Sequence, residues 1–163
     1  MKNSDNQKIS IISEYLDDYL CSKNLNKIIK KVKKSINSKL VFDSIAFRGM
    51  SGALLAPTLA IRLNKQLIMV RKKTETHSGL IVEGNLKSKK YIIVDDFIDS
   101  GLTVANILME IKRVFPRASC QGILLAHGGF RPEFIPIRSF KKRYMWKNLQ
   151  NTIKNDKLQL TAK

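Results

Sequence analysis

Residues 91–103 read Tyr-Ile-Ile-Val-Asp-Asp-Phe-Ile-Asp-Ser-Gly-Leu-Thr, an apolar run that leads into carboxylates and a Ser-Gly-x-Thr turn. The β-branched residues from Ile92 to Val94 are typical of a strand buried on both faces. Beyond the turn, apolar residues recur at helical spacing from Ala105 to Val114. The stretch therefore predicts a strand, a polar loop and a helix, with the loop at the carboxyl end of the strand. Ligands of open α/β sheets bind at that end.

The residue types of this loop suit a sugar phosphate. Ser100 and Gly101 let the backbone turn tightly with its N–H groups inward, and the following helix adds its positive dipole end, so a phosphate monoester fits there. Thr103 adds a hydroxyl donor. Asp95 and Asp96 are acceptors for the vicinal hydroxyls of a ribose and ligands for Mg²⁺. The loop alone is equally consistent with a capped helix whose aspartates are ordinary turn residues.

The pattern Val94-Asp95-Asp96-x-x-Asp99-Ser100-Gly101-x-Thr103 resembles the 5-phosphoribosyl 1-pyrophosphate signature of the type I phosphoribosyltransferases in order, spacing and preceding strand. The resemblance extends over residues 40–127, and it implies that Asp95 and Asp96 hold the ribose hydroxyls. It also implies that the backbone and side chains of the turn hold the 5-phosphate, and the residues of this group are Asp99, Ser100, Gly101, Leu102 and Thr103.

A second glycine-bearing loop, residues 48–52, also stands between an expected strand and an expected helix. Gly49 and Gly52 permit a close backbone approach, and Arg48 can hold an anion with two hydrogen bonds. By itself such a turn is more often a packing feature. However, Arg48-Gly49-x-x-Gly52 is similar to the Arg-Gly loops of adenine and xanthine-guanine phosphoribosyltransferases, which implies pyrophosphate binding. The residues expected to bind pyrophosphate are Arg48, Gly49, Met50, Ser51 and Arg71.

The polar connection between Arg71 and Lys90 is the third element. Such a long connection inside a compact domain is usually a lid or an insert. Its start, Val70-Arg71-Lys72, resembles the strand end that leads into the catalytic loop of orotate and adenine enzymes. We therefore expect Lys72, Lys73 and His77 to contact the departing pyrophosphate and, with Asp99, to form the catalytic group. The alternative for His77, weighted equally, is an exposed polar residue without a role.

Two conflicting patterns leave the acceptor base open. Asp99 stands where hypoxanthine-guanine enzymes carry an aspartate near the purine N7, which makes it the candidate general base and favours a 6-oxopurine. Those enzymes also carry a lysine at the end of the next strand, where this chain has His127. The Lys-rich, His-containing connection favours orotate. Further candidates for base contacts are Phe130, Phe134, Trp146, Arg131 and Arg138, although core or dimer contacts are the favoured interpretation for them.

Strands alternating with helices predict one α/β domain with a type I phosphoribosyltransferase-like parallel sheet flanked by helices. We expect N-terminal helices in residues 1–39, a core in residues 40–127, and a short hood with a basic tail in residues 128–163. Expected strands cover residues 41–47, 66–71, 91–94 and 117–126. Asn24 is expected to cap a helix over residues 25–36, and another helix covers residues 53–63, where Pro57 is tolerated only near the start.

The composition is strongly basic. The 163 residues include 30 Lys and Arg against 13 Asp and Glu, a formal net charge of +17, so a polyanionic ligand is expected. We favour a solvated, Lys-rich surface around a pyrophosphate site over RNA binding, because no RNA-recognition signature is present.

The cysteine spacing and the hydropathy bear on the compartment. Cys21 and Cys120 have neither disulfide nor zinc spacing, and no apolar run is long enough for a membrane span, so a cytoplasmic protein is expected.

Together these patterns predict a Mg²⁺-dependent nucleobase phosphoribosyltransferase of nucleotide salvage or biosynthesis. Its substrates are 5-phosphoribosyl 1-pyrophosphate and a purine or orotate. Asp95 and Asp96 are the expected metal ligands, acting mostly through the bound sugar. The alternative is a regulator that keeps the fold, senses nucleotides and binds RNA. Homodimer formation is an expectation by analogy with the family.

Overall fold

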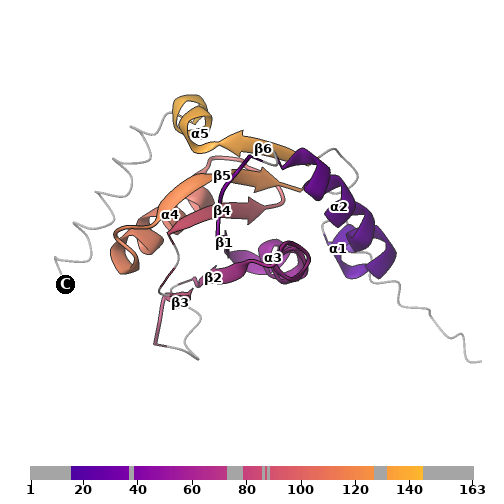
Figure 1. Cartoon of the computed structure of the whole chain (residues 1–163), viewed down its shortest axis with the longest axis horizontal. Helices are drawn as coiled ribbons and strands as arrows, with labels where there is room; N and C mark the ends of the chain where they lie inside the picture. Colours follow the sequence, from indigo (N-terminus) through magenta and orange to yellow (C-terminus); the bar gives the residue numbers. More distant parts are fainter. Residues whose placement is uncertain are drawn as a thin grey trace, which may run out of the picture.

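The computed structural model describes residues 16–36, 39–72, 79–85, 87, 89–126 and 132–144. These residues form a six-stranded sheet with the strand order β3-β2-β1-β4-β5-β6 (Figure 1). The strands are β1 (Ser44–Phe47), β2 (Gln66–Val70), β3 (Val82–Gly84), β4 (Lys90–Asp95), β5 (Ser119–Leu125) and β6 (Glu133–Pro136). The helices are α1 (Asp17–Leu20), α2 (Ser22–Ser35), α3 (Gly49–Leu63), α4 (Leu102–Val114) and α5 (Ile137–Arg143).

The four central strands β2, β1, β4 and β5 are parallel, and the two edge strands β3 and β6 pair antiparallel to their neighbours. The expected α/β sheet is therefore confirmed, and all four expected strands form within it. The edge strands and α5 were not predicted, because β3 and β6 are too short to show an alternating pattern. β6 comes from the segment assigned to the hood and ends at Pro136, a residue that edge strands tolerate.

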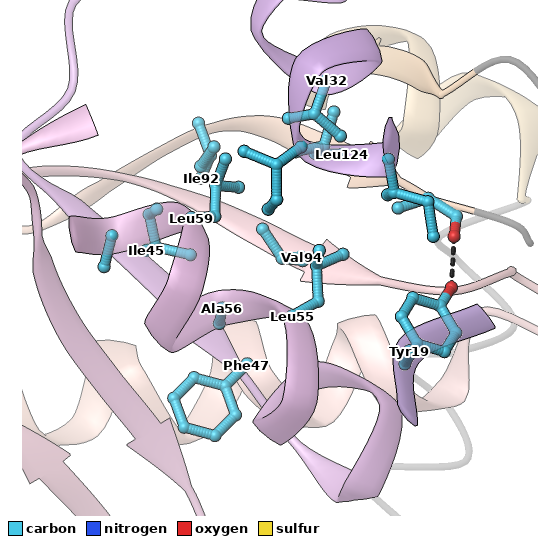
Figure 2. Packing of buried hydrophobic residues seen from close by; sticks show 14 of the residues in the cluster. Tyr19, Val32, Ile45, Phe47, Leu55, Ala56, Leu59, Ile92, Val94 and Leu124 are labelled. Atoms are coloured by element: carbon cyan, nitrogen blue, oxygen red, sulfur yellow. Dashed lines mark hydrogen bonds between the residues drawn. The ribbon is translucent and has the colours of Figure 1, made fainter. Parts of the chain in front are cut away.

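The order in which the chain adds strands to the sheet reverses between the parallel strands β1 and β4. From β1 the chain passes through α3 to β2 on one side, and from β4 it passes through α4 to β5 on the other. Side chains of β4 alternate accordingly. Ile92 and Val94 pack in the cluster that contains α3 (Figure 2). Tyr91 and Ile93 pack in the cluster that contains α4. The adjacent strands β1 and β4 thus form a topological switch point, where their two following loops diverge.

The N-terminal helices lie on the α3 side of the sheet. Ile29 and Val32 of α2 are buried in the same cluster as Leu124 of β5. The hydroxyl of Tyr19 in α1 donates a hydrogen bond to the carbonyl of Ala126, just beyond β5 (Figure 2). The N–H of Ala126 in turn donates to the carbonyl of Asp95 at 3.0 Å. A chain of two hydrogen bonds therefore connects the N-terminal helix to the end of β4.

Two helix starts differ from expectation. Cys21, not Asn24, occupies the N-cap position of α2, and the amide of Asn24 donates to Asp18 at 3.2 Å, so the predicted cap was wrong. Helix α3 begins at Gly49 and places Pro57 in its interior. An interior proline costs about 3 kcal/mol. Burial of a leucine such as Leu55 contributes about 1.5–3 kcal/mol, and Leu59 is buried as well, so packing offsets that cost. None of the helices among the described residues is long and apolar enough to cross a membrane.

Candidate active site

A cavity of about 450 Å³ opens at the carboxyl ends of β1 and β4, and we call it the β1/β4 cavity. One wall is the β1–α3 loop, another is the β4–α4 loop, and Lys72 after β2 contributes a side chain. The lining residues are Arg48, Gly49, Met50, Ser51, Lys72, Asp95, Asp96, Phe97, Ile98, Asp99, Ser100, Gly101, Leu102, Thr103 and Val104. The volume lies within the range of small-molecule sites, and the location is the switch point of the sheet.

The first turns of two helices line this cavity. Gly49 opens α3 with φ +77°, and Gly101 precedes α4 with φ +80°, conformations that other residues rarely adopt. Neither helix carries an acidic residue in its first turn, so no carboxylate there neutralises the positive end of the dipole. The side chains that follow the two glycines, Met50 and Leu102, are exposed. The backbone N–H groups of both turns are therefore suited to anions.

Gly52 keeps the first loop close to the sheet. A Cβ atom at this position would lie 2.9 Å from the Cβ of Phe47 in β1 and 3.5 Å from the carbonyl of Val94 in β4. Because backbone-attached atoms cannot move aside independently, a side chain at Gly52 would push α3 away from both strands. The glycine thus sets the spacing between the β1–α3 loop and the Asp95–Asp96 pair that follows Val94.

The C-terminal helix α5 packs against the second loop. A Cβ atom on Gly101 would lie 3.3 Å from the Phe140 ring and 3.6 Å from Cβ of Tyr144. Phe140 is fully buried, and its ring stacks on that of Tyr144 with centroids 4.9 Å apart. Gly101 therefore has two constraints, a left-handed backbone and a neighbouring aromatic ring, and both hold the turn in place.

Asp95 and Asp96 are both buried at the end of β4, each with 7% of its surface exposed. The N–H of Asp96 donates to Oδ1 of Asp95 at 3.1 Å. Burial raises the pKa of Asp95 to about 8, the side-chain hydrogen bond and the charge of Asp96 also raise it, and the backbone N–H of Asp96 opposes this shift. Burial therefore disfavours the charged form of Asp95 despite this N–H donor, and ligand hydroxyls or a cation at the pair would favour it.

The structure brings together most of the residues predicted for the donor site. The lining of the cavity includes every residue assigned to the ribose and 5-phosphate, and four of the five assigned to pyrophosphate. The exception is Arg71, which forms an ion pair with Glu83 across β2 and β3 and does not line the cavity. Lys73 and His77 lie outside the described residues, as do His127, Phe130, Arg131 and Trp146.

Three lining residues were not singled out from the sequence, namely Phe97, Ile98 and Val104. Phe97 follows the aspartate pair and exposes 45% of its surface. Its place in a turn gave no reason to expect an exposed aromatic ring in the lining of the cavity. Phe134, considered for base stacking, lies instead over Gly122, where its ring takes the space of a missing side chain. Arg138 is exposed on α5.

The carboxylates of the cavity fit a shared Mg²⁺ site better than a metal cage of protein ligands. Within the described ranges, no group of three or more His, Cys, Asp or Glu side chains could hold a metal ion. Mg²⁺ in proteins is commonly bound by one or two carboxylates together with substrate phosphates and water. Asp95 and Asp96, adjacent and facing a cavity with two anion-binding turns, match that arrangement.

A family model described as the phosphoribosyl transferase domain matches residues 13–148. An orotate phosphoribosyltransferase of Pyrococcus horikoshii is 36% identical over 89 residues, which are 52% of this chain and 47% of that protein. The transcriptional regulator GfcR of Methanocaldococcus jannaschii is 29% identical over 100 residues, 56% of this chain and 46% of that protein. The chain thus spans about half the length of these curated relatives.

Among solved structures, adenine phosphoribosyltransferase of Saccharomyces cerevisiae aligns with a TM-score of 0.55 and 23% identity, over 66% of this chain and 70% of that one. The similarity concerns the fold, since the identity is low.

Proposed function

Because the chain belongs to the phosphoribosyl transferase domain family, we propose that it transfers the ribosyl phosphate of 5-phosphoribosyl 1-pyrophosphate to a nucleobase. In this reaction the bond between C1 of the ribose and the pyrophosphate oxygen breaks, and pyrophosphate leaves with the electron pair. A ring nitrogen of the base forms the new bond to C1 and loses its proton. The products are a nucleoside monophosphate and pyrophosphate.

The observation that carries this proposal is the composition of the β1/β4 cavity. It combines two backbone turns suited to anions with a buried carboxylate pair between them. The donor has the same three parts, a 5-phosphate, a pair of ribose hydroxyls and a pyrophosphate. A simple phosphate site would need only one of the turns, and a metal site built from protein ligands alone would need more carboxylates than this pair.

Each part of the donor has a proposed place. The turn from Ser100 to Thr103 binds the 5-phosphate through backbone N–H groups and hydroxyls. Asp95 and Asp96 accept hydrogen bonds from the ribose hydroxyls. The pyrophosphate contacts the β1–α3 turn and the side chains of Arg48 and Lys72.

The protein acts mainly by positioning the reactants and excluding water. A bound Mg²⁺ would neutralise charge on the leaving pyrophosphate. The ribosyl transition state has oxocarbenium character, so a donor held open to solvent would hydrolyse. Asp99, an exposed residue in the cavity lining, is the proposed acceptor of the proton from the base. Lys73 and His77 remain proposed contacts of the pyrophosphate.

The acceptor is a purine or orotate. Asp99 supports a 6-oxopurine, whereas the P. horikoshii relative is named for orotate and the yeast structure for adenine. The direct experiment incubates the protein with Mg²⁺, the pyrophosphorylated sugar and each base in turn, and measures pyrophosphate release. One base should give turnover far above the hydrolysis seen without a base.

The variant Asp96→Asn should abolish that turnover, and Glu133→Gln is its matched control. Both replace a carboxylate by an amide, but Glu133 is exposed, does not line the cavity and forms an ion pair of 3.8 Å with Arg143. The proposed transferase activity would be refuted if no base stimulated pyrophosphate release, or if Asp96→Asn left that release unchanged.

A second function is suggested by the regulator from M. jannaschii. In that case the same cavity would bind the pyrophosphorylated sugar or a nucleotide as a signal and would not transfer the ribosyl group. Calorimetric binding that is lost in Asp96→Asn, combined with no turnover for any base, would favour this function over the enzyme.

A further inference from the structure

Helix α2 carries a lysine face that the β1/β4 cavity does not use. The helix contains six lysines, and all of them are exposed. At 3.6 residues per turn, four of them fall within about 60° of the helix circumference. We call the row of Lys23, Lys27, Lys30 and Lys34 the α2 lysine row, and Lys31 and Lys33 flank it.

The opposite side of α2 is fixed to the core. Ile28, Ile29 and Val32 are buried, and they pack in the cluster that contains α3 and the centre of the sheet. Figure 1 shows α2 at the outer edge of the molecule, with α1 and α3 beside it. The lysine row is therefore held on a rigid element and faces solvent along the whole length of the helix.

The charges of the row are not balanced within the described part of the chain. The helix itself contains no Asp or Glu. Three ion pairs among the described residues join Arg71 to Glu83, Arg113 to Glu110 and Arg143 to Glu133, and no α2 lysine takes part in them. Lysines three or four positions apart on a helix repel each other. A polyanion laid along the row would relieve this repulsion.

The kind of polyanion follows from what surrounds the lysines. A helix that binds a membrane surface inserts its apolar face, but that face of α2 is buried in the protein. A protein partner would be expected to contact aromatic residues and arginine, and α2 has neither. Lysines without such neighbours are suited to contacts with the phosphates of a nucleic acid. Such contacts do not depend on the base sequence.

From the geometry of this row we propose that α2 binds the phosphate backbone of a nucleic acid, independently of sequence. None of its lysines lines the β1/β4 cavity, so this surface is separate from the proposed site of transfer and holds for either proposed function. Four phosphate contacts to a single strand give a slope of about −3 for the logarithm of affinity against the logarithm of salt concentration, or about a 50-fold loss between 50 and 200 mM salt.

The test measures binding of a labelled 20-nucleotide oligouridylate to the full chain by fluorescence anisotropy, across a series of salt concentrations. The variant replaces the four lysines of the row by glutamine, which supports helices well. The matched control replaces four exposed lysines elsewhere, Lys87, Lys89, Lys90 and Lys142, by glutamine. Both variants lower the net charge by four, so only position differs between them.

We expect the α2 variant to lose tenfold or more in affinity, and its salt slope to become shallower by about 3. The control should lose less than threefold. The same measurement with a duplex DNA of the same length shows which nucleic acid is preferred. For the duplex, each phosphate contact contributes about −0.9 to the slope of log affinity against log salt concentration, compared with about −0.7 for the single strand. Equal losses in the two variants, or binding that does not depend on salt, would overturn the proposal, as would binding to anionic lipid vesicles but not to either nucleic acid.

Footprinting of the unaltered protein provides a second readout that does not depend on a variant's folding. Amine acetylation with and without the oligouridylate should show protection at the α2 lysine row and none at Lys87 or Lys142. Protection spread evenly over the lysines of both regions would contradict the proposal.

Discussion

Replacing Gly101 with alanine should weaken both the fold and the binding of phosphate. At φ +80° an alanine costs about 1–2 kcal/mol in backbone strain. Its Cβ would also lie 3.3 Å from the Phe140 ring, which is fully buried and cannot move freely. Overpacking of a well-packed site costs about 1–3 kcal/mol, and the mild contact here belongs at the lower end. We therefore expect Gly101→Ala to lower the free energy of unfolding by about 2–3 kcal/mol.

Any relaxation of that strain rotates the peptide groups of the turn, which are the proposed donors to the 5-phosphate. One hydrogen bond to a charged group contributes about 1.5–3 kcal/mol, so its loss should reduce the affinity for ribose 5-phosphate by roughly 10- to 150-fold. Urea denaturation measures the first effect, and isothermal titration calorimetry with ribose 5-phosphate measures the second.

Gly79→Ala is the matched control, because a Cβ there meets nothing within 4 Å. It should change the free energy of unfolding by less than about 0.5 kcal/mol. A second background, Phe140→Leu, removes the ring and should reduce the additional penalty of Gly101→Ala if the contact contributes. The reasoning would be refuted if Gly101→Ala were as harmless as Gly79→Ala, or if it destabilised the protein but left ribose 5-phosphate affinity unchanged.

Three further predictions concern the cavity. Gly52→Ala should lower the free energy of unfolding by about 1–3 kcal/mol in urea, because its Cβ would lie 2.9 Å from that of Phe47, and a loss below about 0.5 kcal/mol contradicts this packing. The raised pKa of Asp95 means that the folded protein holds a proton the unfolded chain releases, so stability should fall as pH rises through neutrality. Asp95→Asn should remove that slope in urea denaturation between pH 5 and 9 and raise stability at pH 8, while a variant as pH-sensitive as the parent would assign the slope to other groups. Lys72→Gln should weaken pyrophosphate binding in calorimetry about tenfold, the loss of a charged hydrogen bond, and more than Arg71→Gln does; the reverse order would place Arg71 in the site.

The donor side of the site could be predicted because its chemistry is local in sequence. Asp95, Asp96 and the turn from Ser100 to Thr103 lie within nine consecutive residues, between a strand and a helix with clear patterns. The Arg48 loop likewise follows directly on a buried strand. Parallel strands place their carboxyl ends at one edge of the sheet, so two such loops that follow neighbouring strands lie next to each other.

The rest depended on contacts between distant residues. Tyr19 reaches Ala126 across 107 positions, and Phe140 packs against Gly101 from a short helix without a strong apolar pattern. Arg71 resembled a pyrophosphate ligand by its place after a strand, but its partner Glu83 lies on β3, a strand of three residues that no periodicity could indicate.

The charge was visible in the composition but its distribution was not. A helix was expected over residues 25–36. Only the packed structure shows that the helix extends to include Lys23, that its lysines form one exposed row, and that this row takes part in none of the ion pairs described above. The base-contacting candidates around residues 127–131 fall outside the described residues, so the acceptor stays a prediction.

The two anion-binding turns present main-chain groups to the cavity, while Met50 and Leu102 beside the two glycines are exposed. These two positions are therefore suited to an environment-sensitive dye, which could be attached through an introduced cysteine without altering the amides. The exposed Cys21 would first be replaced by serine, and Cys120 would react slowly because burial raises the pKa of its thiol to about 12. A pair of such reporters would allow occupancy of each turn to be followed separately in real time, before any acceptor is known.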